Sequence, residues 1–202
     1  MPPDSFIELP SDPHLRRWMM FVDGENLTKR AQQIAENEAV GLEEGPYHSR
    51  DVFIWFPDRE GTLSLLPTRY KLQPHAIRSY YYTTTGGDEN EIKRIRECLW
   101  DMAFQPEVFK RPRARRQQAK GVDIALTKDF LSHAYSDNYD VAVLVAGDGD
   151  YVPLVDEVKR LGKGVFVVFF RDSGLNPELR LSSDVFFELD ESFISAWQSQ
   201  QD

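Results

Sequence analysis

Residues 141–153 read VAVLVAGDGDYVP, in which an unbroken run of apolar side chains ends in two glycine–aspartate pairs. Apolar runs without alternation are typical of the central strands of a parallel sheet, because those strands are buried on both faces. The two glycines allow a tight turn after the strand, and Pro153 suits the first turn of a helix. The stretch therefore predicts a buried strand, a turn that presents Asp148 and Asp150, and then a helix.

A second apolar strand of this kind, at residues 18–22, runs directly into Asp23 and Gly24. In an open parallel sheet, ligands bind at the carboxyl ends of the strands. A further acid, Asp123, lies in the first turn of a predicted helix within the segment KGVDIALTK. Carboxylates gathered in one place repel one another unless a cation lies between them, and Mg²⁺ or Mn²⁺ is the usual partner of an all-oxygen cluster. The acids therefore indicate metal-dependent phosphodiester chemistry at Asp23, Asp123, Asp148 and Asp150.

Strand and helix patterns alternate along the chain, which predicts an α/β fold with a central, mostly parallel sheet flanked by helices. We expect one domain over residues 17–198, an irregular N-terminal arm over 1–16, and an insert at about 41–74 that contains a short strand or apolar turn at 51–56. The expected strands are 18–22, 76–83, 107–110, 141–146, 164–170 and 185–189. The expected helices are 26–38, 89–103, 122–135, 151–161, 176–181 and 191–198.

Composition narrows the function classes. The net charge of −9 argues against a passive nucleic-acid coat, which is normally basic, but it leaves room for a nuclease with one local basic patch. A single cysteine, Cys98, excludes an internal disulfide and a multi-cysteine zinc site. No apolar run approaches the roughly 20 residues that cross a bilayer, and the N-terminus lacks the pattern of a signal peptide. We therefore expect a cytoplasmic protein with no membrane partner.

The one dense positive stretch, residues 110–120, leads directly into Asp123. Such a run is usually a solvated loop. Beside a metal cluster, however, its cations are what a polyanionic backbone needs for positioning. Thr127, one helical turn above Asp123 on the same face, is a further candidate, whereas Asp129 is secondary and the aromatic strand at 80–82 is better explained by core packing. The candidate substrate-binding residues are Lys120, Arg111, Arg113, Arg115, Arg116 and Thr127.

Each acid also has an ordinary structural explanation. Asp23 could be a turn residue with Asn26 as a helix cap, and Asp150 could cap the helix that follows it. Asp123 is electrostatically favoured at a helix N-terminus in any case. The position of Asp148 in the sequence suggests no structural role of this kind.

Taken together, three segments resemble the signature segments of NYN domains, which belong to the PIN-like nuclease superfamily. They are FVDGENL at 21–27, KGVDIAL at 120–126 and LVAGDGDYVPLV at 144–155. The resemblance covers about residues 17–190 and implies a PIN-like three-layer fold, an acidic cleft that binds Mg²⁺ or Mn²⁺, and RNA as the substrate class. It carries the family's acids onto Asp23 with Asn26 beside it, onto Asp123, and onto Asp148 and Asp150. The insert at 41–74 departs from the family pattern, which leaves substrate access and a homo-oligomer open.

The resulting hypothesis is a metal-dependent ribonuclease that acts on single-stranded or structured RNA. Metal ions held by the four aspartates would activate water and stabilise charge on the scissile phosphate, and Asn26 would orient a ligand or the substrate. The alternative is a catalytically silent RNA-binding or scaffold module that retains the metal cleft. A phosphatase of the haloacid-dehalogenase type is a weaker alternative, because that type places a second Asp two residues after the first and this chain has Glu25 there.

Overall fold

A computed structural model describes residues 15–37, 48–49, 52–53, 66–111, 121–171 and 174–189. Its centre is a six-stranded sheet in the order β5-β4-β1-β6-β7-β8, with every neighbouring pair parallel. The mostly parallel α/β fold expected from the sequence is therefore confirmed. The sheet strands are β1 (Trp18–Asp23), β4 (Ser79–Thr85), β5 (Gln105–Lys110), β6 (Val141–Val145), β7 (Gly164–Phe169) and β8 (Val185–Glu188).

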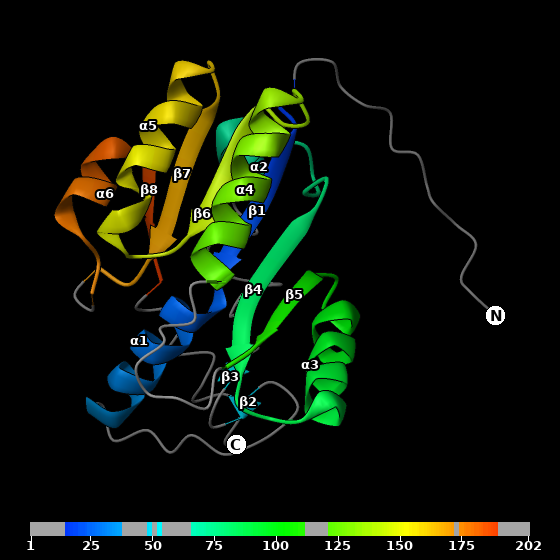
Figure 1. The fold of residues 1–202 in the computed structure, drawn as a ribbon. Helices are drawn as coiled ribbons and strands as arrows, with labels where there is room; N and C mark the ends of the chain where they lie inside the picture. The colour runs from blue at the N-terminus through cyan, green and yellow to red at the C-terminus, as the bar shows by residue number, and fades with distance from the viewer. Residues whose placement is uncertain are drawn as a thin grey trace.

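Helices cover both faces of this sheet and give three layers (Figure 1). Side chains of α4, α5 and α6 pack on one face against Phe21, Tyr82 and Leu144. Side chains of α1 and α3 pack on the other face against Val22, Tyr81 and Val143. The helices are α1 (Gly24–Asn37), α2 (Leu66–Tyr70), α3 (Glu89–Asp101), α4 (Gly121–Tyr135), α5 (Val152–Arg160) and α6 (Pro177–Ser182). Within the part of the chain that the structure describes, no helix has the length and apolar character to span a membrane.

The central strands β1 and β6 are apolar along most of their length, because helices cover both faces of the sheet there. All residues of β1 and β6 are buried, including Asp23 at the end of β1. The three consecutive tyrosines of β4, Tyr80, Tyr81 and Tyr82, are also all buried and point to the two helical layers in turn. They therefore belong to the core, as the sequence indicated, and offer no surface on which bases could stack.

The strand order places a switch point between β1 and β6. From β1 the chain passes through α1 to β4 and β5 at one edge of the sheet, then returns to β6 on the other side of β1. This is the doubly wound order in which ligands bind outside the carboxyl ends of the two central strands, where their connections leave in opposite directions. Asp23 ends β1, and Asp148 follows the end of β6. Both acids therefore lie at the switch point.

Several element boundaries differ from the sequence prediction. Helix α1 begins at Gly24, two residues before the expected start at Asn26. Strand β4 covers Ser79–Thr85 and not 76–83, so three threonines lie at its carboxyl end. The insert contains α2, which the sequence did not indicate, and an antiparallel hairpin of β2 (His48–Ser49) and β3 (Val52–Phe53) that lies against α1 and β4. Residues 1–14 of the arm expected at 1–16, and the helix expected at 191–198, lie outside the described residues.

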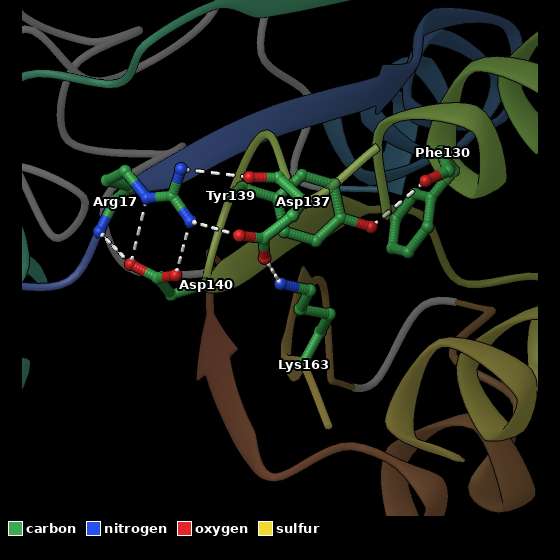
Figure 2. Close-up of polar contacts among 6 residues, drawn as sticks. All are labelled: Arg17, Phe130, Asp137, Tyr139, Asp140 and Lys163. Atoms are coloured by element: carbon green, nitrogen blue, oxygen red, sulfur yellow. Dashed lines mark hydrogen bonds and ion pairs between the residues drawn. The ribbon is translucent and has the colours of Figure 1, made fainter. Parts of the chain in front are cut away.

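The opposite end of the sheet is held by an ion-pair network around Arg17 (Figure 2). The Asp140 carboxylate accepts from the Arg17 backbone N–H at 2.7 Å, and from its guanidinium at 2.9 and 3.3 Å. The guanidinium also donates to the Asp137 carbonyl at 2.9 Å, and Lys163 pairs with the Asp137 carboxylate. Tyr139 donates its hydroxyl to the Phe130 carbonyl at 3.0 Å. These contacts join the start of β1 to the connections that precede β6 and β7.

Candidate active site at the carboxyl ends of β1 and β6

Asp23 is a buried carboxylate that lies where β1 becomes α1. It is 4% exposed, and its Oδ1 accepts from the Asn26 backbone N–H at 2.9 Å, so Asp23 caps the helix. Burial raises its pKa to about 6, against the opposing effect of the hydrogen bonds from Asn26 and Tyr151. The negative charges of Asp123 and Glu25 raise this pKa further. Asp23 is therefore both a structural cap and a destabilised anion.

Asn26 does not cap α1, contrary to the structural explanation offered by the sequence. Its side-chain Oδ1 accepts the backbone N–H of Gly147 at 3.0 Å. This bond joins the first turn of α1 to the end of β6 across the switch point. Asn26 therefore fixes the distance between the two strand ends from which Asp23 and Asp148 project.

The turn after β6 requires glycine at position 147. A Cβ added to Gly147 would lie 2.3 Å from the Phe169 ring and 2.8 Å from the Gly174 carbonyl oxygen. Asp148 follows and accepts the Asp150 N–H at 3.1 Å, which caps a short 3₁₀ turn at Gly149–Tyr151. The cap of this turn is therefore Asp148 and not Asp150, which the sequence offered as an alternative, and Asp148 has a structural role that its position in the sequence did not suggest. Both carboxylates are exposed at the mouth of the site.

Tyr151 connects two of the acids. Its hydroxyl lies 2.9 Å from Asp23 Oδ2 and 3.2 Å from Asp123 Oδ1. A phenol has one proton, so it donates to one of these carboxylates at a time. Burial, followed by the charges of Asp23 and Asp123, raises the Tyr151 pKa, so the phenol stays neutral and remains a donor. The ring is 3% exposed, which places this bridge at the floor of the site.

Asp123 interacts electrostatically with the other acids of the site. It lies in the first turn of α4 and is exposed. Partial burial raises its pKa, the hydrogen bond from Tyr151 lowers it, and the charges of Asp148, Glu25 and Asp150 raise it again. The four predicted aspartates therefore lie near enough to act on one another, and Glu25 is a fifth member of the acidic cluster.

The donor chemistry of this cluster fits a hard divalent cation. Its carboxylates offer only oxygen ligands, and Mg²⁺ and Mn²⁺ prefer such ligands. Among the residues that the structure describes, no three His, Cys, Asp or Glu side chains are arranged to hold a metal ion. Asp123, Asp148 and Asp150 are exposed side chains, whereas Asp23 and Tyr151 are buried.

The predicted substrate-binding residues are only partly described. Arg111 follows β5; its backbone N–H donates to the Thr85 carbonyl at 2.7 Å and its Nη2 to Thr84 Oγ1 at 3.3 Å. Thr127 is half-buried on α4, one turn after Asp123. The Asp129 carboxylate accepts the Tyr82 hydroxyl at 3.0 Å, which gives this secondary candidate a structural role. Lys120, Arg113, Arg115 and Arg116 lie outside the described residues, and their role stays a prediction.

Sequence reasoning missed Tyr151, Glu25 and a group of buried hydroxyls. Among the described residues, the buried polar side chains other than tyrosine are Asp23, Thr28, Thr83, Thr84 and Thr85. All five lie at the carboxyl ends of β1 and β4 or in the first turns of α1. A signal was present for Tyr151, because it directly follows the Gly-Asp-Gly-Asp turn. Nothing in the sequence pattern marked the threonines, because the predicted strand ended at residue 83.

Comparisons with known proteins identify the family and the fold. The model of the NYN domain matches residues 17–190, which is most of the chain, and NYN domains are generally nuclease-like. A crystal structure of a protein of unknown function from Vibrio parahaemolyticus is 20% identical, with a TM-score of 0.62, and covers 92% of this chain and 99% of its own. That likeness shows the fold.

A structure from Parabacteroides merdae, described as a candidate oxidoreductase, is 14% identical with a TM-score of 0.30. It covers 92% of this chain and 30% of its own, and at that TM-score it carries no argument. No significant match is found among curated proteins.

Proposed function

This chain belongs to the NYN domain family, and from that membership together with the acidic site we propose that it is a metal-dependent ribonuclease. The observation that supports the proposal most directly is the Tyr151 hydroxyl between Asp23 and Asp123, at 2.9 and 3.2 Å. A protein that needed these groups only for folding would not gain from holding two repelling carboxylates on one donor. Costly charge concentrated at a switch point is typical of a functional site.

Each residue has a distinct part in this proposal. Asp23, Asp123 and Asp148, with help from Asp150, would hold Mg²⁺ or Mn²⁺. A cation held there would supply charge stabilisation for the scissile phosphate and would make a neighbouring water more acidic.

The remaining residues set the positions of these ligands. Tyr151 keeps its neutral hydroxyl within hydrogen-bond distance of both Asp23 and Asp123, and donates to one of them at a time. Asn26 fixes the end of β6, and with it the turn that presents Asp148, through its bond to Gly147. RNA is the proposed substrate, and Arg111 is the described member of the basic run that would contact it.

Incubation of the full chain with labelled single-stranded RNA, duplex RNA and DNA, each with Mn²⁺, Mg²⁺ or EDTA, tests the function. We expect divalent-dependent cleavage of RNA. Asp148→Asn should abolish cleavage and keep the fold, since an asparagine oxygen can still cap the turn at Gly149–Tyr151. Asp156→Asn, which removes an exposed acid of α5, is the matched control and should cut as the wild type does. Binding of RNA without cleavage under every metal condition would instead establish the silent RNA-binding module.

A further inference from the structure

A polar pocket of about 390 Å³ adjoins the acidic cluster on the side of β4 and α1. Its lining includes Glu25 and Lys29 from the first turns of α1, Thr83 and Thr84 from the end of β4, and Arg111 after β5. The pocket therefore opens at the same edge of the sheet as Asp23. Glu25 lines this pocket and also belongs to the acidic cluster, so the two sites share one residue.

The pocket contains the groups that bind phosphate oxygens. Arg111 Nη2 donates to Thr84 Oγ1 at 3.3 Å, and Thr84 in turn donates to Glu25 Oε2 at 3.3 Å. Lys29 Nζ lies 2.8 Å from Glu25 Oε1. A guanidinium, an ammonium and a threonine hydroxyl on three elements are the donors that proteins use most often for a nucleic-acid backbone.

Glu25 accepts from Lys29 and Thr84, so a phosphate would have to replace it at these two donors, while Arg111 donates to Thr84. The exchange costs little at Lys29, whose side chain is 68% exposed, because exposed ion pairs stabilise proteins weakly. Lys110 and Arg111 are the described members of the basic run at residues 110–120, and Arg111 lines the pocket.

We propose that this pocket binds a backbone phosphate of the RNA substrate, adjacent to the scissile phosphate. Its donors would be Lys29, Arg111 and Thr84. The inference rests on the proposed ribonuclease function and names the path that the substrate takes. The strand enters over the end of β5, places one phosphate between α1 and β4, and passes Glu25 to reach the acidic cluster.

The test measures binding of a short fluorescent oligouridylate to the full chain by anisotropy, in EDTA so that the RNA stays intact. Lys29→Gln and Arg111→Gln should each weaken binding about five- to tenfold at low salt, and each should flatten the slope of log affinity against log salt by roughly 0.7, because one phosphate contact is lost. Lys93→Gln is the matched control for Lys29, since it also removes an exposed helical lysine from an i,i+4 pair with a glutamate. Arg160→Gln, at the far end of α5, is the control for Arg111.

A substitution at Glu25 separates binding from a merely structural role of the Lys29–Glu25 pair. Glu25→Gln removes the group that competes for Lys29 and should raise RNA affinity about three- to tenfold, whereas Glu97→Gln, the same change in the pair with Lys93, should leave it unchanged. Melting temperatures of all variants establish that each is folded. If Glu25→Gln binds RNA no better than Glu97→Gln does, the pocket does not hold a phosphate.

The remaining outcomes distinguish this inference from the proposed function. If the wild type cleaves RNA but the Lys29 and Arg111 variants bind RNA as tightly as their controls do, the phosphate pocket is overturned. The proposed ribonuclease function then still stands. A wild type that neither binds nor cuts RNA would overturn both proposals. Unlabelled oligouridylate, uridine monophosphate and inorganic phosphate serve as competitors; displacement by inorganic phosphate at the same concentration as the oligomer would show a free-phosphate site in place of a strand site.

Discussion

Asp23 has two roles that act against each other on the stability of the protein. As the cap of α1 its carboxylate stabilises the fold through the bond to the Asn26 N–H, yet its charge is buried beside Asp123 and Glu25. Burial raises its pKa to about 6, so at neutral pH the folded protein holds a buried anion. In the unfolded chain, water would solvate the same carboxylate freely. Such a residue is kept for function and not for stability.

Asp23→Asn should therefore stabilise the protein while it abolishes cleavage. The asparagine oxygen can still accept the Asn26 N–H, and the buried charge is gone. In EDTA at pH 7.5 we expect the free energy of unfolding in urea to rise by about 1–3 kcal/mol, the equivalent of a pKa displaced by one to two units. Asp156→Asn on the exposed face of α5 should leave it unchanged. A less stable Asp23→Asn variant would show that the carboxylate is needed for the fold.

Tyr151→Phe tests the role of the Tyr151 hydroxyl, which lies between the Asp23 and Asp123 carboxylates. Phenylalanine fills the same buried space but leaves Asp23 Oδ2 without its donor, so unfolding in urea should become easier by about 1–3 kcal/mol. The two carboxylates also lose their common anchor, and we expect cleavage to fall at least tenfold and Mn²⁺ affinity, measured by electron paramagnetic resonance, to fall with it. Tyr135→Phe, an exposed tyrosine on α4, is the control. Unchanged Mn²⁺ affinity in Tyr151→Phe would limit the hydroxyl to a role in folding.

At the scale of elements, the end of β6 depends on a close approach that only glycine permits. In Gly147→Ala the new methyl group would meet the Phe169 ring and the Gly174 carbonyl oxygen. The ring can turn away but the backbone oxygen must move, so we expect a loss of about 1–3 kcal/mol in the free energy of unfolding, as for other overpacked sites. The shift also breaks the Asn26–Gly147 bond, and cleavage should fall more than stability predicts. Wild-type activity in a folded Gly147→Ala protein would contradict that coupling.

The ion pair between Arg17 and Asp140, at the other end of the sheet, predicts how the free energy of unfolding depends on pH. Arg17 donates hydrogen bonds to the Asp140 carboxylate and lowers its pKa (Figure 2), so this carboxylate stabilises the fold above its unfolded pKa, roughly 3.9, and stops doing so as the pH falls through its lower folded pKa. Asp140→Asn should cost about 1 kcal/mol at pH 7, because the partly exposed pair is screened by solvent. The difference from wild type should narrow below about pH 4 in urea unfolding. An equal difference at pH 7 and pH 3 would exclude the charge as its cause.

The elements also show what a sequence pattern can and cannot predict. Periodicity and apolar runs indicated β1, β6 and α4, because a residue's burial in those elements follows from its neighbours in the chain. The sequence offered Asn26 and Asp150 as possible caps, whereas Asp23 and Asp148 hold these positions, because a cap depends on where the helix starts to within one residue. The contacts of Asn26 with Gly147 and of Tyr151 with Asp23 join positions more than a hundred residues apart. Such contacts follow from strand order and register, and the pattern of one chain contains neither.

At the scale of the whole molecule, the strand order explains why residues from distant segments form one site. In a parallel sheet, acids that directly follow the strands lie at the same edge, so this part of the site could be predicted from the sequence. The order β5-β4-β1-β6-β7-β8 adds that β1 and β6 are neighbours, so Asp23 and Asp148 face one switch point. The same order places the threonines of β4 beside α1, and so creates the polar pocket next to the acids. Under the proposed function, a chain with a net charge of −9 would bind RNA at this edge through Lys29 and Arg111.

Binding of a divalent cation to this edge should stabilise the entire molecule. An ion that binds the folded cluster and not the unfolded chain adds about 2.7 kcal/mol at a hundredfold excess over its Kd. For a domain of this size the melting temperature should then rise by roughly 5–10 °C. We expect this rise with millimolar Mn²⁺ against EDTA, a much smaller rise in an Asp23→Asn, Asp123→Asn double variant, and the full rise in Asp156→Asn. Because the acids repel one another without a cation, an unchanged wild-type melting curve in Mn²⁺ would mean that the cluster does not bind the ion, and that these carboxylates lie together for a reason other than metal-dependent chemistry.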